Sequence, residues 1–282
     1  MKKNVLIAGC GYVGAELASQ LLATQTCHVW GLKRNPGNLP AGITPVRGDF
    51  SSTETLGKWP ERIDYMIFSA SANEHTEAGY RAVYITGLKN ILSHLVREGY
   101  QPARVFFTSS TSVYHQCEGE WVNEASPTEP ATFSGKIMLQ AEDLLHDAPF
   151  PSTVVRFGGI YGPGRNRLIQ LVKEGRGCYK SPVVYGNRIH RDDCAGIVAH
   201  LIQQAEKNNT VSPVYIGVDN NPESMHTLFH WLAKEIDIKL DDNYKTPARG
   251  NRRCSNHLIR QSGYTFKYPD YKAGYKEELR LC

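Results

Sequence analysis

The stretch Val5-Leu6-Ile7-Ala8-Gly9-Cys10-Gly11-Tyr12-Val13-Gly14 decides the fold of this chain of 282 residues. An apolar run stops at three glycines with the spacing GxGxxG, and a helical pattern with apolar Leu17, Leu21 and Leu22 follows at once. In such a βαβ unit the first glycine permits a tight turn, the second admits a pyrophosphate to the backbone, and the third lets helix pack on strand. The motif predicts a dinucleotide site that includes Gly9, Gly11, Tyr12, Val13 and Gly14; a glycine-rich turn without a ligand is the alternative.

Short apolar runs alternate with amphipathic helical patterns through the first two thirds of the chain. This alternation predicts an α/β fold with a doubly wound parallel sheet of the Rossmann type. The predicted strands are 5–8, 28–32, 43–46, 65–69, 105–109, 153–157 and 214–218, and the predicted helices begin near 77 and cover 136–146, 192–204 and 224–236. We expect a dinucleotide-binding domain over 1–157, to which part of 189–218 returns, and a small substrate-binding lobe over most of 158–282.

Composition argues against several classes of protein. The net charge of +4 is small and the cations are dispersed, so no nucleic-acid partner is expected. No apolar stretch approaches membrane-spanning length, and the first apolar run is too short for a signal peptide, which favours a cytoplasmic protein without a membrane partner. No cysteine lies in a C-x-x-C pair, as expected of free thiols in a reducing compartment; they are Cys10, Cys27, Cys117, Cys178, Cys194, Cys254 and Cys282.

The end of the second predicted strand discriminates between the two nicotinamide dinucleotides. An Asp or Glu there would accept hydrogen bonds from the ribose 2′-hydroxyl of NAD. This chain has Lys33 and Arg34 instead, and two cations match the extra 2′-phosphate of NADP. The pattern favours NADP, with NAD as the second choice; two solvated surface charges are the alternative explanation.

Further strand ends extend the predicted cofactor site. Asp49 and Phe50 follow the third strand, where an acid can accept from the adenine amino group and an aromatic ring can cover the base. An ordinary turn that begins at Asp49 is the alternative. The later strand ends are expected to supply Ser69, Ala70, Ser71, Thr108, Ser109, Phe157 and Gly158.

The chain resembles the extended short-chain dehydrogenase/reductase superfamily, which contains nucleotide-sugar epimerases and dehydratases. The resemblance runs from residue 5 to about residue 223. It rests on residues 9–14, Gly48-Asp49, Thr108-Ser109-Ser110-Thr111-Ser112-Val113-Tyr114, residues 156–164 and Ile189-His190-Arg191-Asp192-Asp193. It implies that Ser110 hydrogen-bonds the reacting oxygen of the substrate, and that a Tyr-x-x-x-Lys pair with a glutamate four residues later transfers protons.

The sequence departs from this family at the proton-transfer pair. Glu142 fits the glutamate, and counting back from it places Ser134 at the tyrosine position and Met138 at the lysine position. Lys136 points about 160° away from the lysine position on a helix. A serine without a neighbouring base is a poor acid or base at pH 7, so Tyr84 and Tyr161 are considered as replacements, with packing in the core or the lobe as the alternative for each.

A second departure concerns the substrate. The segment from Gly164 to Arg188 is shorter than in relatives that bind nucleotide sugars, which disfavours a full nucleotide sugar. The cations expected at the cleft mouth suit a smaller anionic substrate, although a solvated basic rim fits equally well; they are Arg165, Arg188, His190 and Arg191.

Two functions follow as hypotheses. The first is an NADP(H)-dependent oxidoreductase or epimerase-like enzyme that acts on a small molecule with a carbonyl or hydroxyl group, anionic or sugar-related. The second is a catalytically silent NADP(H)-binding regulator or sensor, because the cofactor motif is kept while the proton-transfer pair is not. The helices near 77–97 and 136–146 allow a homodimer. No metal site is expected from the spacing of His75, His94, His115 and His146.

Overall fold

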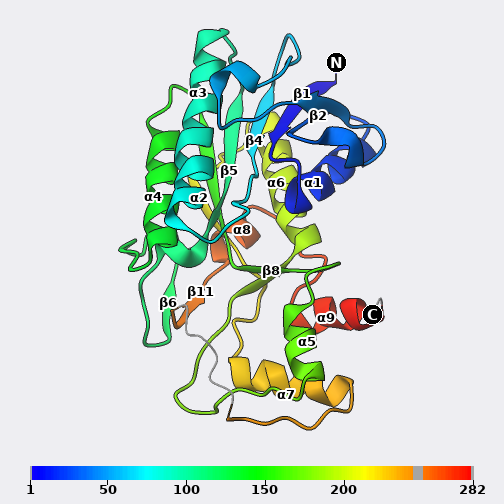
Figure 1. Ribbon diagram of the computed structural model, residues 1–282, viewed down its shortest axis with the longest axis vertical. Helices are drawn as coiled ribbons and strands as arrows, with labels where there is room; N and C mark the ends of the chain where they lie inside the picture. Colours follow the sequence, from blue (N-terminus) through cyan, green and yellow to red (C-terminus); the bar gives the residue numbers. More distant parts are fainter. Residues whose placement is uncertain (1, 244–249, 281–282) are drawn as a thin grey trace.

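The computed structural model describes residues 2–243 and 250–280, and its centre is a seven-stranded parallel sheet (Figure 1). The strands lie in the order β10-β7-β5-β4-β1-β2-β3, and every neighbouring pair is parallel. They are β1 (Lys3–Ala8), β2 (Cys27–Lys33), β3 (Thr44–Arg47), β4 (Tyr65–Phe68), β5 (Arg104–Ser110), β7 (Ser152–Phe157) and β10 (Val214–Gly217). The predicted doubly wound sheet is confirmed. Its strand order reverses between β1 and β4, where such folds bind ligands.

Helices cover both faces of the sheet (Figure 1). On one face lie α1 (Tyr12–Ala23) and α6 (Arg191–Glu206), which pack on Val5 and Ile7 of β1. On the other lie α2 (Glu77–Tyr80), the π-helical turn η3 (Arg81–Gly87), α3 (Leu88–Arg97) and α4 (Phe133–His146). Leu6 and Ala8 of β1 face this second layer. Burial on both faces explains why the central strands are almost continuously apolar.

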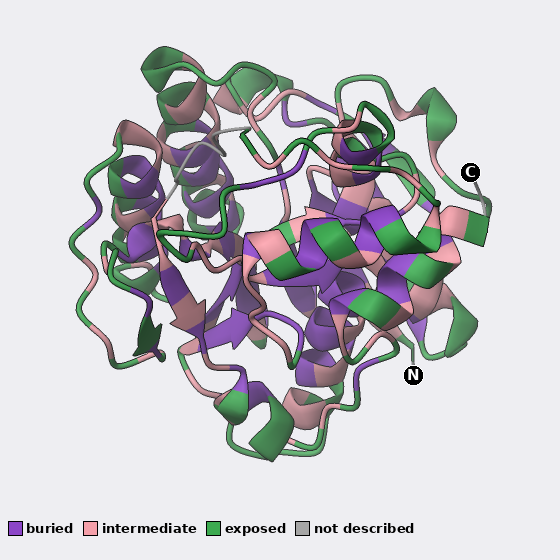
Figure 2. Ribbon diagram, turned by 90° about the horizontal axis from the view of Figure 1, so that it is seen from below, coloured by how far each residue is buried: buried purple, intermediate pink, exposed green. Residues whose placement is uncertain are grey.

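The small lobe is built around its own apolar core. Its helices are α5 (Arg167–Lys173), α7 (Met225–Glu235) and α9 (Tyr271–Arg280), and this core includes Ile169, Phe229 and Tyr275. A two-stranded sheet pairs β8 (Gly159–Tyr161) with β9 (Arg188–His190), and another pairs β6 (Glu120–Val122) with β11 (Arg252–Cys254). Viewed from below, the inward sides of the helices are buried and their outer sides exposed (Figure 2).

The remaining elements are short. The helix α8 (His257–Gln261) packs against β10, and its Ile259 belongs to the core on the α1 and α6 face. Within the described ranges, 3₁₀ turns lie in three connections: η1 (Pro36–Asn38), η2 (Thr53–Thr55) and η4 (Thr111–Val113). Among the described helices, none combines the length and the apolar character that a membrane span requires.

One buried ionic network joins α4 to the sheet. Nη2 of Arg156 on β7 lies 2.6 Å from Oε2 of Glu142 on α4, and its Nη1 donates to the hydroxyl of Tyr114 at 2.8 Å. Ser109 donates to the same carboxylate. These bonds fix the rotational position of α4 relative to the ends of β5 and β7, and thus determine which side chains of α4 face the ligand-binding edge.

Candidate active site

The three glycines of the β1–α1 turn meet the geometric demands of a dinucleotide site. Gly9 has φ +81°, and a Cβ there would lie 2.4 Å from Cα of Ala70. A Cβ on Gly14 would lie 2.9 Å from the carbonyl oxygen of Gly9, whereas a Cβ on Gly11 would meet only that oxygen, at 3.9 Å. The outer glycines therefore allow close packing, and the middle one leaves its surroundings open to a ligand.

The helix that follows begins without a side-chain cap. Gly11 is the N-cap residue of α1, and no side chain of the described residues accepts a hydrogen bond from the first turn. The first N–H groups of a helix have no partner within the helix, and its dipole favours negative charge at that end. The start of α1 therefore fits a pyrophosphate.

A cavity of about 840 Å³ opens at the carboxyl ends of the central strands. It brings together many of the predicted site residues, from seven separate parts of the chain. They are Tyr12, Val13, Ser69, Ala70, Ser71, Tyr84, Thr108, Ser109, Ser110, Ser134, Phe157, Gly158 and Arg165. A cavity at the strand-order reversal, with hydroxyl groups on several strand ends, has the position and chemistry of a cofactor and substrate site.

The cations predicted to select NADP lie at the end of β2, beside the glycine turn. The N–H of Gly9 donates to the carbonyl of Leu32, the residue before Lys33. Lys33 is half-buried, Arg34 is exposed, and neither pairs with a carboxylate among the described residues. Lys33 is in register with Arg47 at the end of β3, a third cation that sequence reasoning missed.

Asp49 and Phe50 have local structural partners, and the adenine-binding role of the two residues stays a prediction. Oδ1 of Asp49 accepts the backbone N–H of Ser51 at 2.9 Å, so the residue begins the ordinary turn that was the alternative. The Phe50 ring packs edge-to-face on Phe68 with 5.5 Å between ring centres, and a Cβ on Gly87 would lie 2.6 Å from it. Phe50 is therefore part of the core beneath η3, and neither residue lines the cavity.

The first turns of α4 present Ser134 and Met138 to the cavity. Lys136 lies between them, is exposed, and does not line the cavity. The hydroxyl of Ser134 lies 3.2 Å from that of Thr132, the N-cap residue of α4. The register counted back from Glu142 is therefore the register of the cavity-facing side of α4, and that side offers no basic group at these positions.

Two further hydroxyl groups face the cavity. Ser110 ends β5, and its Oγ accepts the N–H of Ser112 at 3.1 Å. Tyr84 of η3 is buried, and this burial raises the pKa of its hydroxyl to about 12. A tyrosine with such a pKa stays protonated at neutral pH and donates a hydrogen bond rather than accepting a proton.

Tyr161 does not lie above the cavity, which corrects its predicted role. Its ring stacks on Tyr275 with 4.3 Å between ring centres and belongs to the core of the small lobe. Burial raises the pKa of its hydroxyl far above the ordinary value. Tyr161 therefore packs in the lobe core, which was the alternative explanation. From β8 its side chain reaches Tyr275 of α9 and not the cavity at the ends of the main-sheet strands.

Three of the four predicted substrate cations also lie away from the cavity lining. Arg188 is buried, with Nη2 at 2.8 Å from Sδ of Met225. His190 accepts the N–H of Asp192 at the start of α6, and burial lowers its pKa to about 4. Arg191 pairs with Glu16 at 3.1 Å. The motif around 190 therefore serves to start α6 and to join α6 to α1.

Two arginines do reach the cavity. Arg165 lies 4.1 Å above the ring of Tyr12 and is exposed. Arg252 on β11 is buried, donates to the carbonyl of Thr111 at 2.6 Å, and has an Nε without a hydrogen-bond partner among the described atoms. The only sequence signal for Arg252 was the short run of cations around it. His75, His115 and Cys117 also line the cavity and had not been predicted.

Comparisons with known proteins agree with this arrangement. A family model described as NAD(P)H-binding matches residues 9–205. A solved structure from Methylobacillus flagellatus, provisionally assigned as a NAD-dependent epimerase/dehydratase, is 38% identical with a TM-score of 0.83 and covers 100% of this chain and 99% of that one. Protein YeeZ of Escherichia coli (strain K12) is 25% identical over 288 residues, which are 95% of this chain and 97% of YeeZ. The decarboxylating sterol-4-alpha-carboxylate 3-dehydrogenase of Bos taurus is 28% identical over 202 residues, which are 66% of this chain and 54% of that enzyme.

Proposed function

Because this chain belongs to the NAD(P)H-binding family and to the NAD-dependent epimerase/dehydratase group of extended short-chain dehydrogenases/reductases, we propose that it transfers a hydride between NADP(H) and a small carbonyl-bearing or hydroxyl-bearing anion. The observation that carries the proposal is the cavity itself. It places the start of α1, the hydroxyl of Ser110 and two arginines around one volume. A bound nicotinamide cofactor supplies the hydride, and the protein supplies orientation and charge.

Different residues would bind the cofactor and orient the substrate. The open start of α1 holds the pyrophosphate, and Gly9 and Gly14 keep the turn tight enough for this approach. Ser110 donates a hydrogen bond to the substrate oxygen where negative charge develops. Tyr84, protonated at neutral pH, is a second donor in the same cavity.

The three cations at the ends of β2 and β3 support NADP rather than NAD as the cofactor. Lys33 and Arg47 are adjacent in register, and Arg34 follows Lys33 directly. A 2′-phosphate placed between them would gain charge-assisted hydrogen bonds. The 2′-hydroxyl of NAD would need a hydrogen-bond acceptor at this position, and the side chains of Lys33 and Arg34 are donors only.

Replacing Lys33 and Arg34 together by alanine should raise the Kd for NADPH by at least about 100-fold, because two charge-assisted bonds together contribute about 3 kcal/mol or more. The Kd for NADH should change less than about threefold, since NADH lacks the 2′-phosphate. Fluorescence titration with both cofactors measures this difference. Lys234→Ala, which changes an exposed lysine on α7 in the small lobe, is the control. An equal loss of affinity for both cofactors would contradict the assignment.

The two arginines of the cavity support an anionic substrate. Arg252 is fixed by Thr111, while its Nε lacks a partner among the described residues. A buried donor without a partner is costly, and a carboxylate or phosphate bound in the cavity would satisfy it. Arg165 at the rim adds positive charge that attracts anions into the cavity.

Ser110→Ala should lower the kcat for reduction of the best carbonyl substrate about 100-fold, as expected when one donor to a developing oxyanion is removed. The assay follows NADPH consumption with a panel of small aldehydes, ketones and keto acids. Ser110→Thr keeps the hydroxyl and should restore most of the activity. Retained turnover in Ser110→Ala would show that the substrate oxygen binds elsewhere.

A catalytically silent NADP(H)-binding regulator is the second candidate, and one observation favours it. Ser134 and Met138 line the cavity, and the count back from Glu142 assigns them to the positions at which the resemblance implies the proton-transfer pair. Removal of a positioned acid or base typically lowers a rate about 10²–10⁴-fold. NADPH binding without any turnover across the panel would favour this candidate over the enzyme.

A further inference from the structure

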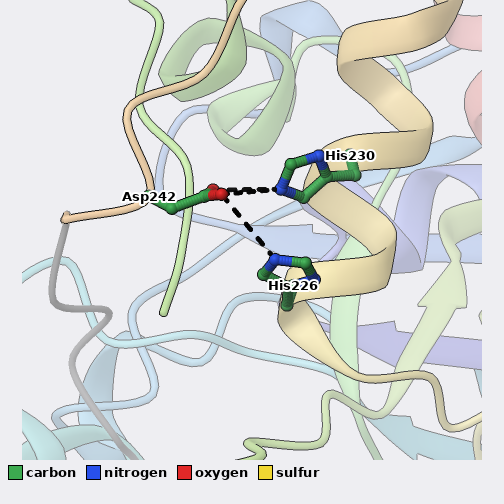
Figure 3. Close-up of side chains that lie close together, drawn as sticks. All are labelled: His226, His230 and Asp242. Carbon is green, nitrogen blue, oxygen red and sulfur yellow. Dashed lines mark hydrogen bonds and ion pairs between the residues drawn. The ribbon is translucent and has the colours of Figure 1, made fainter. Parts of the chain in front are cut away.

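Three possible metal ligands meet in the small lobe, outside the cavity (Figure 3). His226 and His230 lie one turn apart on α7, and their ring centres are 4.2 Å apart. Nε2 of His230 lies 3.0 Å from both carboxylate oxygens of Asp242, and Nε2 of His226 lies 3.8 Å from one of them. Both imidazoles therefore point at one carboxylate.

The elements that carry these side chains are well anchored. α7 buries Leu228, Phe229 and Leu232 on its opposite side, in the core of the lobe. The turn before Asp242 is held by two backbone bonds: Asp241 donates to Gly175 at 2.7 Å and accepts from Gly177 at 2.8 Å. Rigid supports of this kind keep ligands in place for an ion.

Gly177 leaves the space that the Asp242 carboxylate occupies beside the two histidines. A Cβ on Gly177 would overlap Oδ1 of Asp242 and would also come within 2.9 Å of the carbonyl of Asp241. The absence of a side chain at 177 therefore lets the Asp242 carboxylate approach the two histidines. The histidine spacing of four residues puts both rings on one side of the helix, as in helical zinc sites.

We propose that His226, His230 and Asp242 bind one zinc-class divalent transition-metal ion. Two imidazole nitrogens and one carboxylate oxygen are ordinary zinc ligands at about 2.0–2.2 Å, and a tetrahedral site then has ligand atoms about 3.3 Å apart. The separations of 3.0 Å and 3.8 Å lie on either side of that value. Water fills the fourth position, and the ion clamps the turn 241–243 onto α7.

The test is zinc titration of the full, tag-free chain after removal of metal with a chelator. We expect one Zn²⁺ per chain by calorimetry. His230→Ala and Asp242→Asn should each weaken binding about 100-fold, the share of one ligand in a site of this kind. Zinc at 100 times its Kd should raise the Tm by about 5 °C, and this rise should disappear in both variants.

Controls separate this site from other ligands and from misfolding. Cys117→Ser combined with Cys282→Ser removes the exposed thiol of Cys117 and the C-terminal cysteine, and should leave zinc binding intact. His257→Ala removes another exposed histidine and should do the same. The cluster lies outside the cavity, so NADPH binding by His230→Ala should equal that of the wild type and show that this variant is folded.

Two results would overturn the proposal. The first is absence of zinc binding at about 100 μM, a concentration far above the Kd expected of a three-ligand site. The second is zinc binding that persists in His230→Ala and Asp242→Asn but is lost in the cysteine double variant. Either result would reduce the cluster to two histidines hydrogen-bonded to a carboxylate.

Discussion

Glu142→Gln is expected to lower the free energy of unfolding by about 3–5 kcal/mol, the cost of leaving a buried charge without its partner. Nε of Arg156 donates to both carboxylate oxygens at 3.1 Å, and Nη2 donates to one of them at 2.6 Å. The two side chains are only 7% and 2% exposed. Urea unfolding followed by circular dichroism measures the loss, as a lower midpoint with an unchanged slope.

Two comparisons test the cause of this loss. Glu77 and Arg81 form an exposed pair on the surface, so Glu77→Gln should change stability by less than about 1 kcal/mol. Replacing both buried partners, with Glu142→Leu and Arg156→Met, should recover much of the stability, because no unpaired charge is left. A loss below about 1 kcal/mol for Glu142→Gln alone would contradict the role of the ion pair.

The main sheet could be predicted from sequence because its physical cause is local. A strand buried on both faces must be apolar along its length, and the helices between such strands show a period of 3.6 residues. The predicted strand 65–69 corresponds to β4 (Tyr65–Phe68), and the predicted helix 136–146 lies within α4 (Phe133–His146). Glu142 allowed Ser134 and Met138 to be assigned by counting back along α4, because residues four apart lie on the same side of a helix.

The candidate site could be predicted only in part, because its other residues depend on contacts between distant segments. Arg252 reaches the cavity through the pairing of β11 with β6, strands more than a hundred residues apart. Arg47 stands beside Lys33 through a register that no local pattern reveals. The prediction for Arg188 was wrong because a charged side chain indicates an exposed position. In the structure Arg188 is buried and donates to Sδ of Met225, a residue of the lobe core.

Gly9→Ala should lower the free energy of unfolding by about 2–5 kcal/mol. A left-handed backbone costs an alanine about 1–2 kcal/mol, and overpacking adds about 1–3 kcal/mol. Gly9 has φ +81°, and its added Cβ would lie 2.4 Å from Cα and 2.5 Å from N of Ala70. These are backbone atoms of the segment that follows β4, the strand that pairs with β1. Relief therefore requires β1 and the segment after β4 to move apart, which also displaces the cofactor turn.

Gly11→Ala tests the cofactor without the steric overlap expected at Gly9. A Cβ on Gly11 has no neighbour closer than 3.9 Å, but φ −102° with ψ −136° lies outside the regions that alanine favours, so the free energy of unfolding should fall by about 1–3 kcal/mol from backbone strain alone. Its methyl group nevertheless stands where the pyrophosphate must approach, and NADPH affinity should fall about 100-fold. Urea unfolding without cofactor and NADPH fluorescence titration give the two readouts. If Gly9→Ala proved as stable as the wild type, the close packing of the turn on Ala70 would be contradicted. If Gly11→Ala kept full NADPH affinity, the glycine turn would not be the phosphate site.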